Sequence, residues 1–302
     1  MNESDEKLLL VGDNPFHNIS HLSQERARAR TEDPSDPKFA ASLIMAAMDN
    51  GANGFFFSVS ETTLSILKEL DVQGVLGRLH LYPMVPYALE YVRLATQRGG
   101  IPSLAKKLGW EMVKSGNVEA LFFFVKGAWS GDLATLMKMY LAYELSRIRD
   151  SVKSKVKFDA VFLHQLITDM ALALNLERLI KSYIEYLLHK KITPGFNTGN
   201  FAFLVNKFVE WNIDLSKIII AAPFNKVGFQ VTPSIEECEK ALRLLPQPNV
   251  IAISILAAGY INPKEAIEYI AALPNIKGVA IGVSKEKHAS IFKLSSQLLH
   301  SN

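Results

Sequence analysis

The sequence has very little cysteine and no long apolar run, and these two shortages exclude several classes of protein. Its 302 residues contain one cysteine, Cys238, so neither an internal disulfide framework nor a multi-cysteine zinc site can form. No apolar run approaches the roughly 20 residues that a membrane-spanning helix needs. The opening residues, Met1 to Lys7, are polar and acidic, which is not the pattern of a secretory signal. We therefore expect a cytoplasmic protein without a membrane partner.

The sequence also lacks a strong excess of charge of either sign. It carries 33 Lys and Arg against 30 Asp and Glu, a formal net charge of +3. Proteins that bind nucleic acids usually carry a denser basic surface, so we expect no nucleic-acid partner. Hydrophobic residues make up 49% of the chain, which is enough to fill a large core and excludes disorder for most of it.

Eight short apolar runs recur along the chain with amphipathic helical segments between them. Near-continuous apolarity is typical of parallel strands that are buried on both faces. Eight strands, each followed by a helix, predict one (β/α)8 or TIM barrel spanning residues 1–302. A doubly wound sheet would need a glycine-rich turn after an early strand, which Val11-Gly12-Asp13 does not provide. The predicted strands are Leu8–Val11, Gly54–Ser58, Leu79–Met84, Asp159–His164, Ile192–Asn197, Lys217–Asn225, Val250–Leu256 and Gly278–Ser284.

A helical insertion is predicted at residues 86–157, between the third and fourth strands. This segment is far longer than one crossover helix requires, and it carries helical patterns at Ile101–Lys114 and Asp132–Ser151. Because the third βα loop opens on the active face of such a barrel, the insertion could act as a lid over a pocket. It could equally cover an apolar flank or form the interface of a homo-oligomer.

Candidate catalytic residues follow the first and fourth predicted strands, where active sites of such barrels lie. His164 ends the apolar run Ala160–His164, and an imidazole there can transfer a proton or polarise a carbonyl near neutral pH. Asp13 follows the first strand, and Asn14 and His17 come directly after it as candidate substrate-binding residues. We therefore place the chemistry on His164 and Asp13.

Two asparagines end the fifth and sixth predicted strands. The side-chain amides of Asn197 and Asn225 could orient a substrate carbonyl or amide. Asparagine also ends strands for reasons of turn geometry, so a purely structural role is the alternative for each.

The last two βα junctions have the pattern of an anion site. Gly259 follows the seventh strand, and Gly282, Ser284 and Lys285 end the eighth. Glycine lets a ligand approach the backbone closely, and helix N-termini favour negative charge. We predict that these four residues bind a phosphate, including that of a cofactor; the alternative is that the glycines only permit tight turns.

Four segments, taken in order, resemble motifs of the aldo-keto reductase superfamily. The family's patterns are G-[IV]-N-x-F-D-T-A, D-L-x-L-x-H, G-x-S-N-F and I-P-G-x-S-x-x-E-H. The resemblance implies a (β/α)8 barrel, an active-site histidine at His164 and NADP bound with its phosphate end near the eighth strand. The matching segments are Gly51–Ser58, Asp159–His164, Gly195–Phe201 and Ile281–His288.

The catalytic tetrad of that family, Asp, Tyr, Lys and His, is matched only at its histidine. Phe56 stands at the position of the Asp, and Ser60 or Glu61 falls near that of the Tyr. The third strand ends in Leu-Tyr-Pro-Met-Val and supplies no lysine. A carbonyl that receives a hydride needs a proton source beside the developing alkoxide, so the chain would have to use other residues.

Three functional hypotheses remain open. The first is an enzyme that acts on a small anionic or phosphorylated molecule, with NAD(P) as the candidate cofactor. The second is a non-catalytic aldo-keto reductase-like barrel that acts as a binding or scaffold protein through its insertion. The third is a metal-dependent hydrolase or lyase that uses Asp13, His17, His21 and His164. The four-residue spacing of His17 and His21 would place them on one side of a helix, but Gly12 and Pro15 favour a loop there. We therefore predict no metal site.

Overall fold

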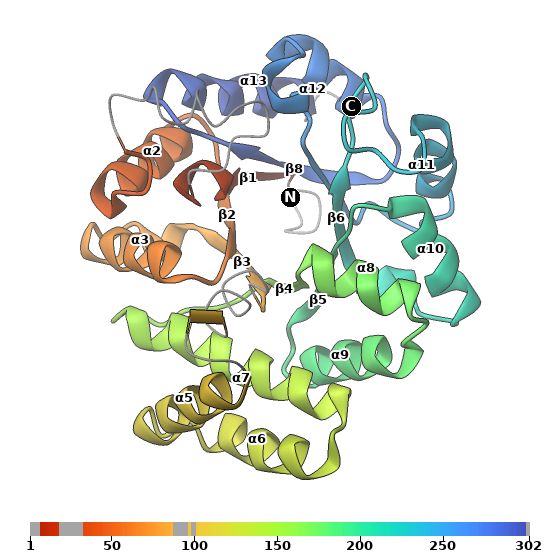
Figure 1. Cartoon of the computed structure of the whole chain (residues 1–302). Helices are drawn as coiled ribbons and strands as arrows, with labels where there is room; N and C mark the ends of the chain where they lie inside the picture. Colours follow the sequence, from red (N-terminus) through yellow and green to blue (C-terminus); the bar gives the residue numbers. More distant parts are fainter. Residues whose placement is uncertain (1–6, 18–32, 87–95, 98–100, 300–302) are drawn as a thin grey trace.

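The computed structural model describes residues 7–17, 33–86, 96–97 and 101–299. Within these residues eight parallel strands pair in chain order and close into a barrel (Figure 1), so the predicted (β/α)8 fold is confirmed. The strands are β1 (Leu8–Gly12), β2 (Gly54–Ser58), β3 (His80–Val85), β4 (Ala160–Leu163), β5 (Thr193–Asn197), β6 (Ile219–Pro223), β7 (Val250–Ile253) and β8 (Ile276–Gly282).

The helices surround the barrel, as Figure 1 shows. Side-chain caps begin the first two α-helices: the Asp36 side chain accepts from the N–H of Phe39, and Ser60 forms a capping box with Thr63. The α-helices are α2 (Pro37–Asp49), α3 (Glu61–Val72), α5 (Ile101–Lys114), α6 (Val118–Ser130), α7 (Leu133–Ser151), α8 (Gln165–Ala173), α9 (Glu177–His189), α10 (Phe201–Glu210), α11 (Ile235–Leu242), α12 (Pro263–Ala271) and α13 (Ser290–Leu299). Among the described helices, none combines the length and the apolarity needed to cross a bilayer.

Four strands, β4, β6, β7 and β8, end earlier than predicted, and the difference is informative for β7 and β6. The seventh strand was predicted to extend to Leu256. It ends at Ile253 because Ser254 adopts a left-handed backbone conformation, with φ of 55°. The run Lys217–Asn225 contributes only Ile219–Pro223 to β6. In both cases apolar residues continue into the loop, so hydrophobicity alone overestimates the strand.

The barrel closes where β1 pairs with β8 over five residues, from Leu8 opposite Gly278 to Gly12 opposite Gly282. Glycine is required at one end of this seam: a Cβ on Gly278 would lie 2.1 Å from the carbonyl oxygen of Leu8. The other end of the seam brings the 3-10 helix η1 (Asn14–His17) beside the end of β8, so the first and last predicted site segments become neighbours.

The interior of the barrel is a packed apolar core. Phe56 of β2 meets Phe162 of β4 edge to face, with ring centroids 4.9 Å apart. Phe162 is fully buried, and a Cβ on Gly195 of β5 would lie 2.6 Å from its ring. The missing side chain of Gly195 therefore makes room for the Phe162 ring.

Among the residues that the structure describes, helices α5, α6 and α7 lie between β3 and β4. Of these, α7 packs against α3, α9 and β3, so it occupies the place of an ordinary barrel helix. Helices α5 and α6 form an additional layer outside α7 (Figure 1). Helix α6 approaches α7 closely at Gly127, where a Cβ would lie 2.6 Å from the side chain of Leu136.

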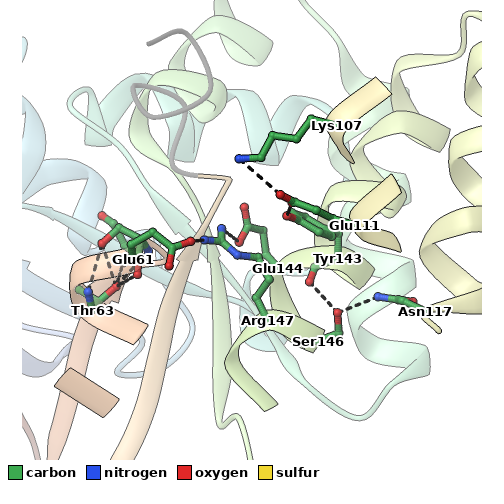
Figure 2. A network of polar contacts seen from close by, with 11 residues as sticks. Glu61, Thr63, Lys107, Glu111, Asn117, Tyr143, Glu144, Ser146 and Arg147 are labelled. Atoms are coloured by element: carbon green, nitrogen blue, oxygen red, sulfur yellow. Dashed lines mark hydrogen bonds and ion pairs between the residues drawn. The ribbon is translucent and has the colours of Figure 1, made fainter. Parts of the chain in front are cut away.

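A polar network joins this part of the chain to the rim of the barrel (Figure 2). Glu144 of α7 is fully buried, and its carboxylate lies 2.9 Å from Arg147 Nη1. Arg147 Nη2 reaches Glu61 at the start of α3, 2.6 Å away. On the opposite side, the Tyr143 hydroxyl donates to Glu111 of α5. The outer layer is thereby held to α7, and α7 is held to the β2–α3 junction.

We predict that Gly195→Ala destabilises the protein through the interior of the barrel. The added methyl group overlaps the ring of Phe162, and overpacking of this kind costs roughly 1–3 kcal/mol in the free energy of unfolding. Denaturant unfolding measures the effect. Gly77→Ala is the control because its Cβ would meet nothing within 4 Å; equal stability of the two variants would contradict the packing argument.

Candidate functional site

Asp13 is a buried carboxylate at the end of β1, with only 3% of its surface exposed. Its Oδ2 accepts a hydrogen bond from the backbone N–H of Ser58 at 2.6 Å and lies 3.2 Å from Nε2 of His17. Among the described residues, Oδ1 has no hydrogen-bond partner. One oxygen of the carboxylate is therefore fixed, and the other remains available to a ligand.

His164 follows β4 and caps α8. Its Nδ1 accepts from the N–H of Leu166 at 3.3 Å, so the neutral ring carries its proton on Nε2. Burial lowers the pKa of His164, and the negative charges of Asp13 and Asp169 oppose that shift. At neutral pH the side chain is thus an uncharged imidazole that carries its hydrogen on Nε2.

The structure brings Asp13 and His164 to the same mouth of the barrel. Strands β1 and β4 stand three places apart in the ring, yet the charge of Asp13 is near enough to raise the pKa of His164. A small molecule bound between them would meet an N–H from one side and a carboxylate oxygen from the other. His17 belongs to this group through Asp13, while Asn14, at the start of η1 (Asn14–His17), is exposed.

Asn197, at the end of β5, also reaches into the barrel. Its Nδ2 lies 3.2 Å from the sulfur of Met84 at the end of β3. Strands β3 and β5 are not neighbours, so this contact crosses the interior. The Oδ1 atom is buried and has no hydrogen-bond partner, and such an atom normally finds one in a folded protein. This makes Asn197 an acceptor that a ligand could satisfy.

Asn225 has a different environment from Asn197. Its Nδ2 donates to the carbonyl oxygens of Phe229 and Ser254, and its Oδ1 accepts from the N–H of Phe229. The amide, 1% exposed, therefore joins the loops that follow β6 and β7. The structure shows Asn225 holding these loops in place.

The four residues predicted to bind an anion lie on the loops after β7 and β8. Gly259 has φ of +93°, and a Cβ there would meet nothing within 4 Å, so its backbone conformation accounts for the glycine. A Cβ on Gly282 would lie 2.9 Å from the ring of Pro15, so contact with η1 accounts for the second.

The two polar members of this group have few partners. Ser284 Oγ lies 3.4 Å from Nδ1 of His288. Lys285 is exposed and forms no ion pair with any described residue. The loop thus carries one cation and one hydroxyl beside the β1–β8 seam.

Two groups at the mouth were not anticipated from the sequence. The first is the backbone N–H of Ser58, which no side-chain pattern can reveal. The second is Asp169 of α8, whose carboxylate accepts from Thr198 Oγ1 at 2.6 Å and from the N–H of Gly199 at 3.0 Å. Asp169 ties α8 to the end of β5, and its position inside an amphipathic helix resembles that of an ordinary surface residue.

The metal hypothesis gains no support from the described part of the chain. Within those residues, no three His, Cys, Asp or Glu side chains are placed to hold a metal ion together. His21, the fourth residue of that hypothesis, lies outside the described residues.

Comparisons with known proteins agree with the fold. No family model matches the chain, and neither does any curated protein. Among solved structures, two chains from Pseudomonas aeruginosa, each described as a putative aldo-keto reductase, are similar. One has a TM-score of 0.61 at 11% identity over 99% of this chain and 100% of the other. The second has a TM-score of 0.56 at 12% identity over 96% and 89%.

A third similar structure is an aldo-keto reductase from Bacillus halodurans in its holo form. Its TM-score is 0.50 at 10% identity, over 88% of each chain. At these identities the likeness concerns the fold. The chain therefore shares the (β/α)8 barrel fold of these structures. The ring of Phe56, which the sequence resemblance set at the position of the family's Asp, is part of the packed interior.

We predict that Asp13→Asn lowers the pKa of His164 further. Burial continues to lower that pKa, while one of the two negative charges that raise it is removed. NMR titration of the histidine ring protons, assigned with His164→Gln, measures the change. Asp214→Asn, in a surface turn of the chain, serves as the control. An unchanged or higher pKa in Asp13→Asn would show that the two residues do not share one site.

We predict that Asn197→Leu raises the free energy of unfolding of the ligand-free protein by about 1 kcal/mol, because it removes a buried acceptor without a partner. The control is Asn249→Leu. Asn249 also has an unpartnered Oδ1, but its Nδ2 donates to the carbonyl oxygens of Leu215 and Ile218, so its loss should destabilise by roughly 2 kcal/mol. Denaturant unfolding of both variants distinguishes the cases; destabilisation by Asn197→Leu would oppose this interpretation.

Proposed function

We propose that the chain is an oxidoreductase-like barrel enzyme that acts on the carbonyl or hydroxyl group of a small anionic or phosphorylated molecule. The observation that carries this proposal is the buried carboxylate of Asp13. Water is largely excluded from it, the N–H of Ser58 and His17 fix one of its oxygens, and His164 lies within electrostatic reach. Burying a charged group costs free energy. Buried ionisable groups of this kind are found most often at functional sites.

The chemistry follows from the protonation states of the two groups. Neutral His164 donates its Nε2 hydrogen to the substrate oxygen and stabilises negative charge as it develops there. Asp13, through Oδ1, takes a proton from a hydroxyl group in the oxidative direction and returns it in the reductive direction. His17 Nε2 orients the carboxylate through Oδ2. This arrangement supplies a proton path that uses none of the missing tetrad residues.

The anionic part of the substrate or cofactor is assigned to the β8 loop. Lys285 supplies the positive charge, Ser284 a hydroxyl and Gly282 an exposed stretch of backbone. These groups lie at the carboxyl end of β8, which pairs with the end of β1 just before Asp13. An anion bound there would place an attached carbonyl near the mouth.

NAD(P) is the cofactor that this arrangement fits best. Lys285 and Ser284 would hold a phosphate, and the half-buried side chain of Ile253 at the end of β7 would offer an apolar surface to the nicotinamide. When bound, the cofactor would supply or accept a hydride. The residues of the chain provide the binding, the orientation and the proton.

We expect NADP⁺, NADPH or inorganic phosphate to raise the melting temperature of the protein, since a ligand at 100 times its dissociation constant stabilises by about 2.7 kcal/mol. Lys285→Gln should reduce that shift, while Lys240→Gln, an exposed lysine on α11, should leave it unchanged. Thermal unfolding with each ligand measures both effects. No shift with any of the three would refute the anion site.

Turnover is tested separately from binding. With a panel of phosphorylated and carboxylated aldehydes and ketones, oxidation of NADPH should be lost by at least about 100-fold in Asp13→Asn, while the ligand-induced thermal shift is retained. Turnover by Asp13→Asn at the wild-type rate would remove Asp13 from the mechanism.

A second candidate function, a binding or scaffold protein, is favoured by one observation. The outer layer formed by α5 and α6 exposes several large apolar side chains. That surface does not depend on whether the barrel is catalytic.

A further inference from the structure

The outer layer exposes large apolar side chains on both of its helices. On α6, Val118, Phe122 and Val125 are 76%, 60% and 62% exposed, and their spacing of four and three residues places them on one side of the helix. On α5, Trp110 and Val113 are 68% and 54% exposed, again three residues apart. We call these five residues the outer α5–α6 face.

The exposure of the outer α5–α6 face is not caused by poor packing of the layer beneath it. The opposite sides of α5 and α6 build a small core of their own: Leu108, Met112 and Ala120 pack with Met139 and Tyr143 of α7. Since both helices bury their inner sides on α7 (Figure 1), their outer sides point away from the barrel. Soluble monomers rarely leave such a set of large apolar groups exposed without a partner.

The charges around the outer face are positive. Lys106, Lys114 and Lys126 are exposed on the same two helices, and Lys126 Nζ lies 6.0 Å from the centre of the Phe122 ring.

The acidic residues of α5 and α6 point to other partners. Glu111 lies 3.4 Å from Lys107 and accepts from Tyr143 (Figure 2). Glu119 accepts from Tyr186 and from Lys190 of α9. The apolar groups are therefore bordered by lysines whose charge the neighbouring carboxylates do not offset.

This charge pattern indicates which kind of partner binds the outer α5–α6 face. A second copy of the chain would bring another face bordered by lysines, and like charges would oppose its approach. A helical peptide is usually bound in a groove, whereas these side chains stand on the outer sides of two helices. Apolar and aromatic side chains with lysines beside them are typical of helices that lie in the headgroup region of an anionic bilayer.

We propose that the outer α5–α6 face binds the surface of an anionic lipid membrane. Trp110, Phe122 and the valines enter the headgroup region, and Lys106, Lys114 and Lys126 contact the lipid phosphates. The protein adsorbs without spanning the bilayer. This departs from our expectation of no membrane partner, because composition does not reveal which apolar side chains stay exposed.

The test uses the full chain and phosphatidylcholine vesicles with and without phosphatidylglycerol, at low and high ionic strength. We expect co-sedimentation only with anionic vesicles, weakened by salt, and a shift of tryptophan emission to shorter wavelength that Trp110→Phe abolishes. We expect each lysine to contribute about fivefold to the binding. The triple variant Lys106→Gln, Lys114→Gln and Lys126→Gln should therefore bind about 100-fold more weakly. Phe122→Ser with Val125→Ser should weaken it about tenfold or more.

The matched control is Val209→Ser with Leu244→Ser, which removes two side chains of similar exposure, 53% and 54%, elsewhere on the surface. It should bind as the wild type does. Circular dichroism and melting temperature establish that each variant is folded. Three results would overturn the proposal: no binding to anionic vesicles, equal binding to pure phosphatidylcholine, or a dimer in sedimentation that Phe122→Ser with Val125→Ser dissociates.

Discussion

The pairing of the first strand with the last is the constraint on which the rest of the molecule depends. Without the β1–β8 seam, eight strands would form an open sheet, and the loops that carry Asp13 and Lys285 would be far apart. The seam requires two backbones to approach closely at Gly278, where no side chain fits. Its other end sets Gly12 opposite Gly282, so the structure that closes the barrel also brings Asp13 and the lysine-bearing loop to one mouth.

The side chains that fill the barrel interior limit which polar groups can stand at its mouth. Phe56 and Phe162 occupy the interior below it, and a carboxylate in place of Phe56 would be buried among apolar side chains at high cost. The buried carboxylate is found instead at the end of β1, where a backbone N–H and a histidine stabilise it. The same (β/α)8 architecture can thus carry its polar groups on a different strand.

The outer layer obeys a different constraint from that of the barrel. Helix α7 serves both as a member of the helix ring and as the support for α5 and α6, through a small apolar core and the buried Glu144–Arg147 pair. Removing one partner of such a pair leaves a buried charge uncompensated. The ion pair therefore favours a single position of α7 against the barrel. The outward sides of α5 and α6 have no such restraint from the barrel, and Trp110, Phe122 and three valines stay exposed there.

The sequence by itself determined the barrel, its strand order and the positions of Asp13, His164 and Asn197 at strand ends, because parallel strands buried on both faces leave an apolar signature and their ends mark one edge. Only the tertiary structure decided that Asn225 is used within its own loops while Asn197 keeps an unpartnered oxygen, since both are strand-terminal asparagines in the sequence. It also decided the roles of the Ser58 N–H and Asp169, and which apolar residues of α5 and α6 stay exposed. These depend on contacts between residues distant in the chain, which a local pattern does not encode.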